Sequence, residues 1–195
     1  MRKNTRILSA AIMLTAMMIA ACSGPHRPDE NKYLTEGKTI ATETFKALSS
    51  ELKGALARGG VPEAISYCNI QAMPITDSLS KRYNAEIKRT SLKIRNPMNA
   101  PDSLELAILK EYRRKFENGD SLHPQILPVG DNKVLFSAPI MVKPLCLNCH
   151  GETGKQIQDT SYAIIQKHYP ADQATGYDAG DLRGMWSIRF NTEEE

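Results

Sequence analysis

The sequence predicts an α+β fold with an antiparallel sheet. Apolar residues recur at helical spacing through the earlier part of the chain, whereas most of the strand-like alternation comes later. No strand–helix–strand unit repeats along the chain, and this disfavours a parallel sheet with crossover helices. The length that remains after an N-terminal apolar segment suits one domain with its own core.

Two helices are expected before the first strand. Apolar side chains over residues 34–56 keep a helical spacing, and Gly59-Gly60 should end that helix. A second helix should begin at Val61-Pro62, because proline is tolerated in a first helical turn. Its apolar face includes Ile65 and Cys68, so we expect Cys68 to point inward.

Three strands and a third helix complete the expected elements. Residues 86–94 suggest a strand with a bulge, because the alternation changes phase along it. Asp102 and Glu105 form an acidic capping box ahead of a helix that should run to Gly119. Regular alternation over residues 133–142 and 185–190 indicates two further strands.

The N-terminus has the layout of a bacterial lipoprotein signal. Basic residues precede an apolar run that is too short to span a bilayer and that ends at Cys22. Residues 19–22 resemble a lipobox, whose cysteine is acylated after cleavage, although a plain secretory signal and an uncleaved anchor remain alternatives. We therefore expect a signal peptide over residues 1–21, a flexible tether over 22–33, a domain over 34–190 and a polar tail over 191–195.

Charge argues against a nucleic-acid partner. The net charge of +3 comes from 25 basic and 22 acidic residues. Because Arg2, Lys3 and Arg6 lie in the signal, the chain after it is formally neutral. Phosphate binding needs a clustered positive surface, so we expect no nucleic acid among the partners.

Residues 146–150 read Cys-Leu-Asn-Cys-His, which is the spacing of a c-type haem attachment site. In such a site the thiols of Cys146 and Cys149 form thioethers with the haem vinyl groups, and His150 binds the iron from one side. A thioredoxin-like redox pair and half of a zinc site use the same cysteines. A thioredoxin-like pair is expected beside a βαβ pattern, and a zinc site needs a second clustered pair of cysteines. The sequence contains neither. One covalent haem c is therefore the expected cofactor.

The residues alone leave the ligand on the other side of the iron open. Several side chains carry suitable donor atoms: Cys68, Met73, Met98, Met141, Met185, His123 and His168. Most methionines in a domain fill its core, and a free cysteine on a buried helix face is often a small apolar residue. The identity matters, because a thiolate lowers the iron potential whereas methionine opposite histidine raises it.

Four stretches, in the same order, resemble the c-type haem family with a PAS-like fold. They are residues 89–97 (RTSLKIRNP), 99–102, 146–151 and 169–184. Members of that family occur alone in the periplasm or lumen and as sensor regions of signalling proteins. The resemblance implies a central antiparallel sheet flanked by N-terminal and connecting helices.

The resemblance also implies residue roles. A cysteine lies opposite the histidine in a structurally described member, and Cys68 matches its position, so Cys68 is the expected second axial ligand. Arg95 and Asn96 lie in the most recognisable stretch, and an arginine beside haem can pair with a propionate. We expect haem contacts for Arg95, Asn96 and Arg183, with a structural turn at Asn96-Pro97 as the alternative for that segment.

The expected function is redox or small-ligand sensing, with monohaem electron transfer as the alternative. No acid–base constellation accompanies the motif, so we expect no enzymatic activity. Since no output segment follows Phe190, a sensor would act through an unidentified redox or signalling protein, with a diatomic gas as a candidate ligand. Ser23 carries no acidic inner-membrane retention signal, so the lipid anchor would place the protein in the cell envelope, facing the periplasm, with the outer membrane favoured.

Overall fold

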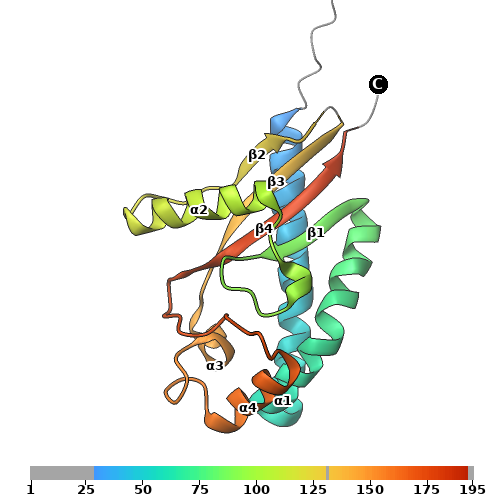
Figure 1. Ribbon diagram of the computed structural model, residues 1–195. Helices are drawn as coiled ribbons and strands as arrows, with labels where there is room; N and C mark the ends of the chain where they lie inside the picture. The colour runs from blue at the N-terminus through green and yellow to red at the C-terminus, as the bar shows by residue number, and fades with distance from the viewer. Residues whose placement is uncertain (1–28, 131, 193–195) are drawn as a thin grey trace, which may run out of the picture.

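The computed structural model describes residues 29–130 and 132–192. Its first element, α1 (Glu30–Tyr83), consists of two helical limbs separated by non-helical backbone at Gly59 and Gly60. Gly60 has a φ of 68°, in the left-handed region that glycine adopts without steric cost. Figure 1 shows the second limb turning back beside the first. The expected pair of helices with a glycine break is confirmed.

The expected tether boundary is wrong at its C-terminal end. Asp29 caps α1 by accepting a hydrogen bond from the Asn31 amide at 3.0 Å, so the helix begins at Glu30. Tyr33 is buried and its ring lies 5.2 Å from the ring of Phe190. The domain therefore begins near residue 29, and the signal peptide, Cys22 and the rest of the tether lie outside the described residues.

The sheet is antiparallel and four-stranded, in the order β1-β4-β3-β2. Its strands are β1 (Ala85–Thr90), β2 (Gln125–Pro128), β3 (Lys133–Met141) and β4 (Leu182–Asn191). The strand patterns at 133–142 and 185–190 are thus confirmed, and the α+β class with them. Two corrections concern β1, which ends at Thr90 and pairs with β4 without a bulge. The register irregularity lies instead between Ile140 and Met141 of β3.

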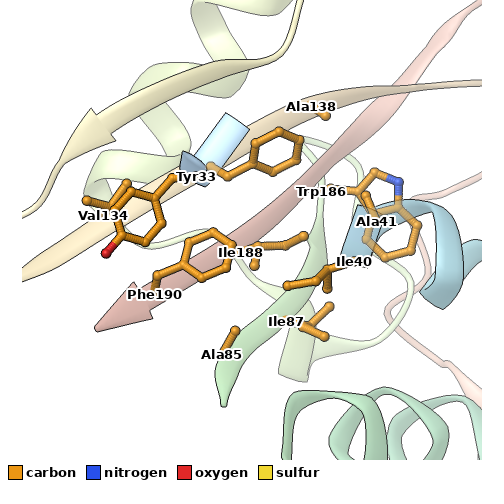
Figure 2. Packing of buried hydrophobic residues seen from close by; sticks show 11 residues of the cluster. Tyr33, Ile40, Ala41, Ala85, Ile87, Val134, Ala138, Trp186, Ile188 and Phe190 are labelled. Carbon is orange, nitrogen blue, oxygen red and sulfur yellow. The ribbon is translucent and has the colours of Figure 1, made fainter. Parts of the chain in front are cut away.

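Helices cover both faces of the sheet, as Figure 1 shows. The first limb of α1 packs on one face, where Ile40 meets alternate strand residues such as Phe136 and Ile188. Figure 2 shows the labelled side chains of this cluster gathered between helix and sheet. On the other face α2 (Ser103–Glu117) packs Leu109 against the intervening residue Leu135. Successive side chains of β3 therefore point to opposite faces of the sheet and pack into two separate cores.

The capping box at the start of α2 is confirmed. Asp102 accepts a hydrogen bond from the Glu105 amide at 2.9 Å, and the Glu105 carboxylate accepts one from the Asp102 amide at 2.9 Å. Glu105 is fully buried and also meets Lys88 of β1 at 2.6 Å and the Ser187 hydroxyl of β4 at 2.6 Å. This carboxylate therefore joins the helix cap to two strands.

Short helices gather where α1 bends, at one end of the sheet (Figure 1). They are η2 (Pro144–Cys146), α3 (Leu147–His150) and α4 (Asp159–His168), while η1 (Pro97–Asn99) follows β1. The sequence patterns indicated neither α4 nor β2. Ile165 of α4 is fully buried against Ile65 of the second limb and Ile157. Across residues 29–130 and 132–192, no helix has the length and hydropathy to cross a membrane.

Candidate functional site

The Cys-x-x-Cys-His segment forms a compact turn at the end of β3. Pro144 starts η2, which passes directly into the four-residue helix α3 ending at His150. Residues three apart on a helical turn share a face, so the side chains of Cys146 and Cys149 can meet one ligand edge. Both are free thiols of intermediate exposure. Burial raises the pKa of Cys149 to about 11, with Arg95 opposing that rise.

His150 is held in one tautomer. Its Nδ1 lies 2.7 Å from the carbonyl oxygen of Ala174, and because a carbonyl only accepts, Nδ1 carries the hydrogen. The lone pair is therefore on Nε2. The Tyr177 ring meets the imidazole edge-to-face, with the ring centroids 6.4 Å apart. Burial, followed by Arg183 and Arg95, holds the pKa of His150 well below its ordinary value, so the ring is in the neutral form that binds metals.

Arg95 contacts protein groups beside the attachment segment. Its Nε and Nη2 donate to the two carboxylate oxygens of Asp172 at 3.1 and 3.0 Å. Nη2 also donates to the Cys149 carbonyl at 2.6 Å. Asn96 accepts from the Met98 amide at 3.0 Å and so caps η1, as the alternative of a structural turn requires. Haem contacts by Arg95 and Asn96 stay predictions.

Arg183 enters the site from the start of β4. Its Nη1 donates to the Lys93 carbonyl at 3.0 Å, and its guanidinium lies 5.4 Å from the centre of the Tyr177 ring. Burial is the main reason that the pKa of Arg183 is lowered, which reflects the cost of enclosing this cation. Since Arg183 also acts on His150, the structure brings it to the attachment segment, where its haem contact stays a prediction.

Cys68 reaches the same region from the second limb of α1. Cys149 packs against the apolar cluster that contains Ile65, one turn before Cys68. Cys68 acts electrostatically on Cys149, and burial raises the pKa of Cys68 while Arg89 and Arg95 lower it. Cys68 of α1 therefore shares one charged neighbourhood with Cys149 and His150, which both belong to α3.

Three of the other candidate axial ligands, Met185, Met98 and His168, lie in different surroundings. Met185 is fully buried in the cluster beneath α2, on the other face of the sheet. Met98 is 74% exposed. His168 contacts the Ser66 hydroxyl at 3.3 Å, which ties α4 to the second limb. Cys68 is thus the candidate whose electrostatic partners include both Arg89 and Arg95, the arginines that also act on His150.

The chain is similar to proteins of one known family. A family model described as Tll0287-like matches residues 6–191. The chain belongs to the Tll0287-like family. The crystal structure of the cyanobacterial heme-protein Tll0287 is similar with a TM-score of 0.61 and 23% sequence identity, covering 87% of this chain and 99% of that chain. At that identity the likeness shows a shared fold. Comparison with curated proteins gives no match.

The site of this Tll0287-like chain contains residues that the patterns did not single out. Asp172, the Ala174 carbonyl and Tyr177 surround His150 and Arg95, while Arg89 and Tyr169 lie near Cys68. All of them fall within the stretches that carry the family resemblance. Their presence there was a usable signal, but no pattern of spacing or periodicity distinguishes them from their neighbours in those stretches.

The donor set of the Tll0287-like site fits a haem. Two free thiols on one helical turn could form thioethers, and the Nε2 lone pair of His150 is available for iron. Burial lowers the pKa of Arg89, which has Cys68, Arg183 and Tyr169 as electrostatic neighbours, so these surroundings suit a group that brings carboxylates. Within the described ranges, no three or more His, Cys, Asp or Glu side chains form a cluster that could hold a metal ion.

Proposed function

We propose that this chain is an exported, lipid-anchored protein that carries one covalent c-type haem and serves as a redox or small-ligand sensing module. The observation that carries the proposal is the convergence of Cys68 from α1 on the Cys149–His150 turn. We also propose that the domain has a PAS-like fold, and its antiparallel sheet flanked by helices supports this assignment.

Each site residue has one role in this proposal. Cys146 and Cys149 would hold the haem through thioethers, and Nε2 of His150 would bind the iron while the Ala174 carbonyl accepts the Nδ1 hydrogen. Cys68 would hold the iron as its second protein ligand. The haem supplies one-electron redox chemistry and an iron coordination site. The protein fixes the ligands, limits water and sets the surrounding charge.

The two proposed ligands differ in how firmly the protein holds them. His150 is hydrogen-bonded through Nδ1 and follows a covalent attachment point in the chain. Cys68 lies on a limb that joins the rest of α1 through Gly59 and Gly60, and burial favours its neutral thiol, the weaker donor. Cys68 is therefore the ligand that a diatomic gas or a change of redox state would displace, and this difference supports sensing.

Ligand uptake separates sensing from electron transfer. The firm placement of His150 favours the second candidate, a monohaem electron carrier, because fixed ligands limit rearrangement on electron exchange. We expect the reduced protein to bind carbon monoxide or nitric oxide with loss of the Cys68 bond. Reversible electron exchange without gas uptake would instead assign the carrier role, while rapid peroxide consumption would contradict the expectation that the protein is not an enzyme.

Electron paramagnetic resonance of the ferric protein tests Cys68. We expect a low-spin signal of the thiolate type that Cys68→Ala abolishes. Met73→Leu is the matched control, because it removes another sulfur from the same limb and should leave the signal unchanged. A native signal in Cys68→Ala would assign Cys68 to the core instead.

Export and anchoring have their own test. Cys22 follows the lipobox-like residues, and it lies outside the described part of the chain. Labelled fatty acid should enter the native protein and be absent from Cys22→Ala. Equal incorporation would reject lipidation at this residue without affecting the haem proposal. Fractionation of the labelled cells would test the favoured outer-membrane location, and crosslinking there would identify a redox or signalling partner.

A further inference from the structure

We infer that Arg95 and Asp172 form a positioning pair that fixes His150 and sets the iron potential through two opposed charges. The inference rests on the proposed function for the haem and for His150 as a ligand. It gives Arg95 a different role from the propionate contact that the sequence suggested, because it acts through the backbone around His150.

The pair itself is buried and geometrically complete. The Asp172 side chain is fully enclosed, and that of Arg95 is 14% exposed. Nε and Nη2 of Arg95 donate to opposite oxygens of Asp172 in the forked arrangement that a guanidinium makes with a carboxylate. Oδ1 of Asp172 also accepts from the Ala174 amide at 2.9 Å. Asp172 therefore holds Arg95 and Ala174 together.

Arg95 extends this contact to the histidine. Its Nη2 donates to the Cys149 carbonyl at 2.6 Å and, more weakly, to the Ala174 carbonyl at 3.3 Å. The Ala174 oxygen accepts the Nδ1 hydrogen of His150 at 2.7 Å. A carbonyl oxygen has two lone pairs, so it can serve both donors. One guanidinium thus contacts the residue before His150 and the acceptor that orients its ring.

The local structure explains why such a contact is needed. Because α3 has only four residues, its carbonyl groups lack most of their helical partners, and Arg95 satisfies that of Cys149. The segment around Ala174 has no regular secondary structure, and Asp172 fixes it by accepting from the Ala174 amide. A lysine could not make the same fork, since it presents a single point of charge.

The two charges of the pair should act on the iron in opposite directions. A positive charge disfavours the more positive ferric state, so loss of the Arg95 charge should lower the reduction potential. Loss of Arg95 also frees the Ala174 carbonyl to accept more strongly from His150, which makes the imidazole a stronger donor and again favours ferric iron. Loss of the Asp172 charge leaves Arg95 uncompensated and should raise the potential.

The test is a charge cycle in the haem-loaded full chain. Arg95→Gln should lower the potential, Asp172→Asn should raise it, and the double variant should lie between the two. Asparagine keeps an oxygen for the Ala174 amide, so it removes charge with little change of shape. Arg114→Gln is the control, because that exposed arginine pairs with Glu111 of the same helix, and Figure 1 shows this helix, α2, away from α3 and α4; the variant should leave the potential unchanged. Shifts of the same sign in the two single variants would overturn the inference.

A second comparison protects the test against misfolding. If Asp172→Asn does not fold, Arg95→Lys keeps the positive charge and should have a potential closer to native than Arg95→Gln has. Equal potentials in the lysine and glutamine variants would overturn the inference. A native chain that carries no haem would instead reject the proposed function, so the two failures are distinguishable.

Discussion

Glu105→Ala should separate the stability of the scaffold from the properties of the site. The Glu105 carboxylate is fully buried beneath α2 and pairs with Lys88 at 2.6 Å. It also accepts from the Ser187 hydroxyl at 2.6 Å and from the Asp102 amide at 2.9 Å. Alanine removes all three interactions and leaves a lysine, a hydroxyl and a helix-cap amide without this partner.

The magnitude follows from the kind of interaction lost. Breaking one partner of a buried ion pair costs about 3–5 kcal/mol. Because Lys88 keeps 27% of its side-chain surface exposed, water offsets part of that loss, whereas the lost helix-cap bond adds about 1 kcal/mol. We expect a total near 4 kcal/mol, which at about 2 kcal/mol per molar urea lowers the unfolding midpoint by roughly 2 M.

The assay is urea unfolding followed by far-ultraviolet circular dichroism, with the haem spectrum recorded on the folded variant. Glu111→Ala is the matched control on the same helix, because Glu111 forms only exposed pairs there, such as that with Arg114, and should cost less than about 1 kcal/mol. The haem spectrum of Glu105→Ala should stay native. A loss below about 1 kcal/mol for Glu105→Ala, or an altered spectrum, would refute the reasoning.

Three further predictions use other parts of the fold. Gly37→Ala should destabilise the protein by about 1–3 kcal/mol in urea unfolding, because its Cβ would overlap the buried ring of Phe136; a stabilised variant would contradict that packing. Tyr112→Phe should cost about 1 kcal/mol, since the hydroxyl donates to the His123 carbonyl at 2.9 Å; unchanged stability would argue against this bond. In the haem-free variant Cys146→Ala/Cys149→Ala, the depressed pKa of His150 should make the free energy of unfolding fall as the pH drops below about 6.5, whereas its contribution is fully present above that pH. Adding His150→Gln should remove this decrease. An identical pH profile in the two variants would exclude His150 as its source.

Features with local causes could be predicted from the sequence. The capping box at Asp102 depends on two side chains three residues apart, and the helical break depends on glycine at position 60. The inward face of the second limb follows from periodicity, which places Cys68 on the same side of the helix as Ile65. These elements needed no information about distant parts of the chain.

The surroundings of His150 could not be predicted in this way. Arg95 meets Asp172 across 77 residues of sequence, and the acceptor for His150 is the backbone of Ala174, which no side-chain pattern reveals. The start of the domain was misplaced for a similar reason. Tyr33 follows a proline- and glycine-containing stretch, and its burial depends on Phe190 at the other end of the domain.

The intact mass of the denatured protein tests the central proposal most directly. The full chain should be produced in a host that exports it and supplies the machinery for covalent haem attachment. We predict that the native chain retains the mass of one haem, that Cys68→Ala also retains it, and that Cys146→Ala/Cys149→Ala loses it. A native protein with the mass of the bare polypeptide would contradict covalent haem attachment.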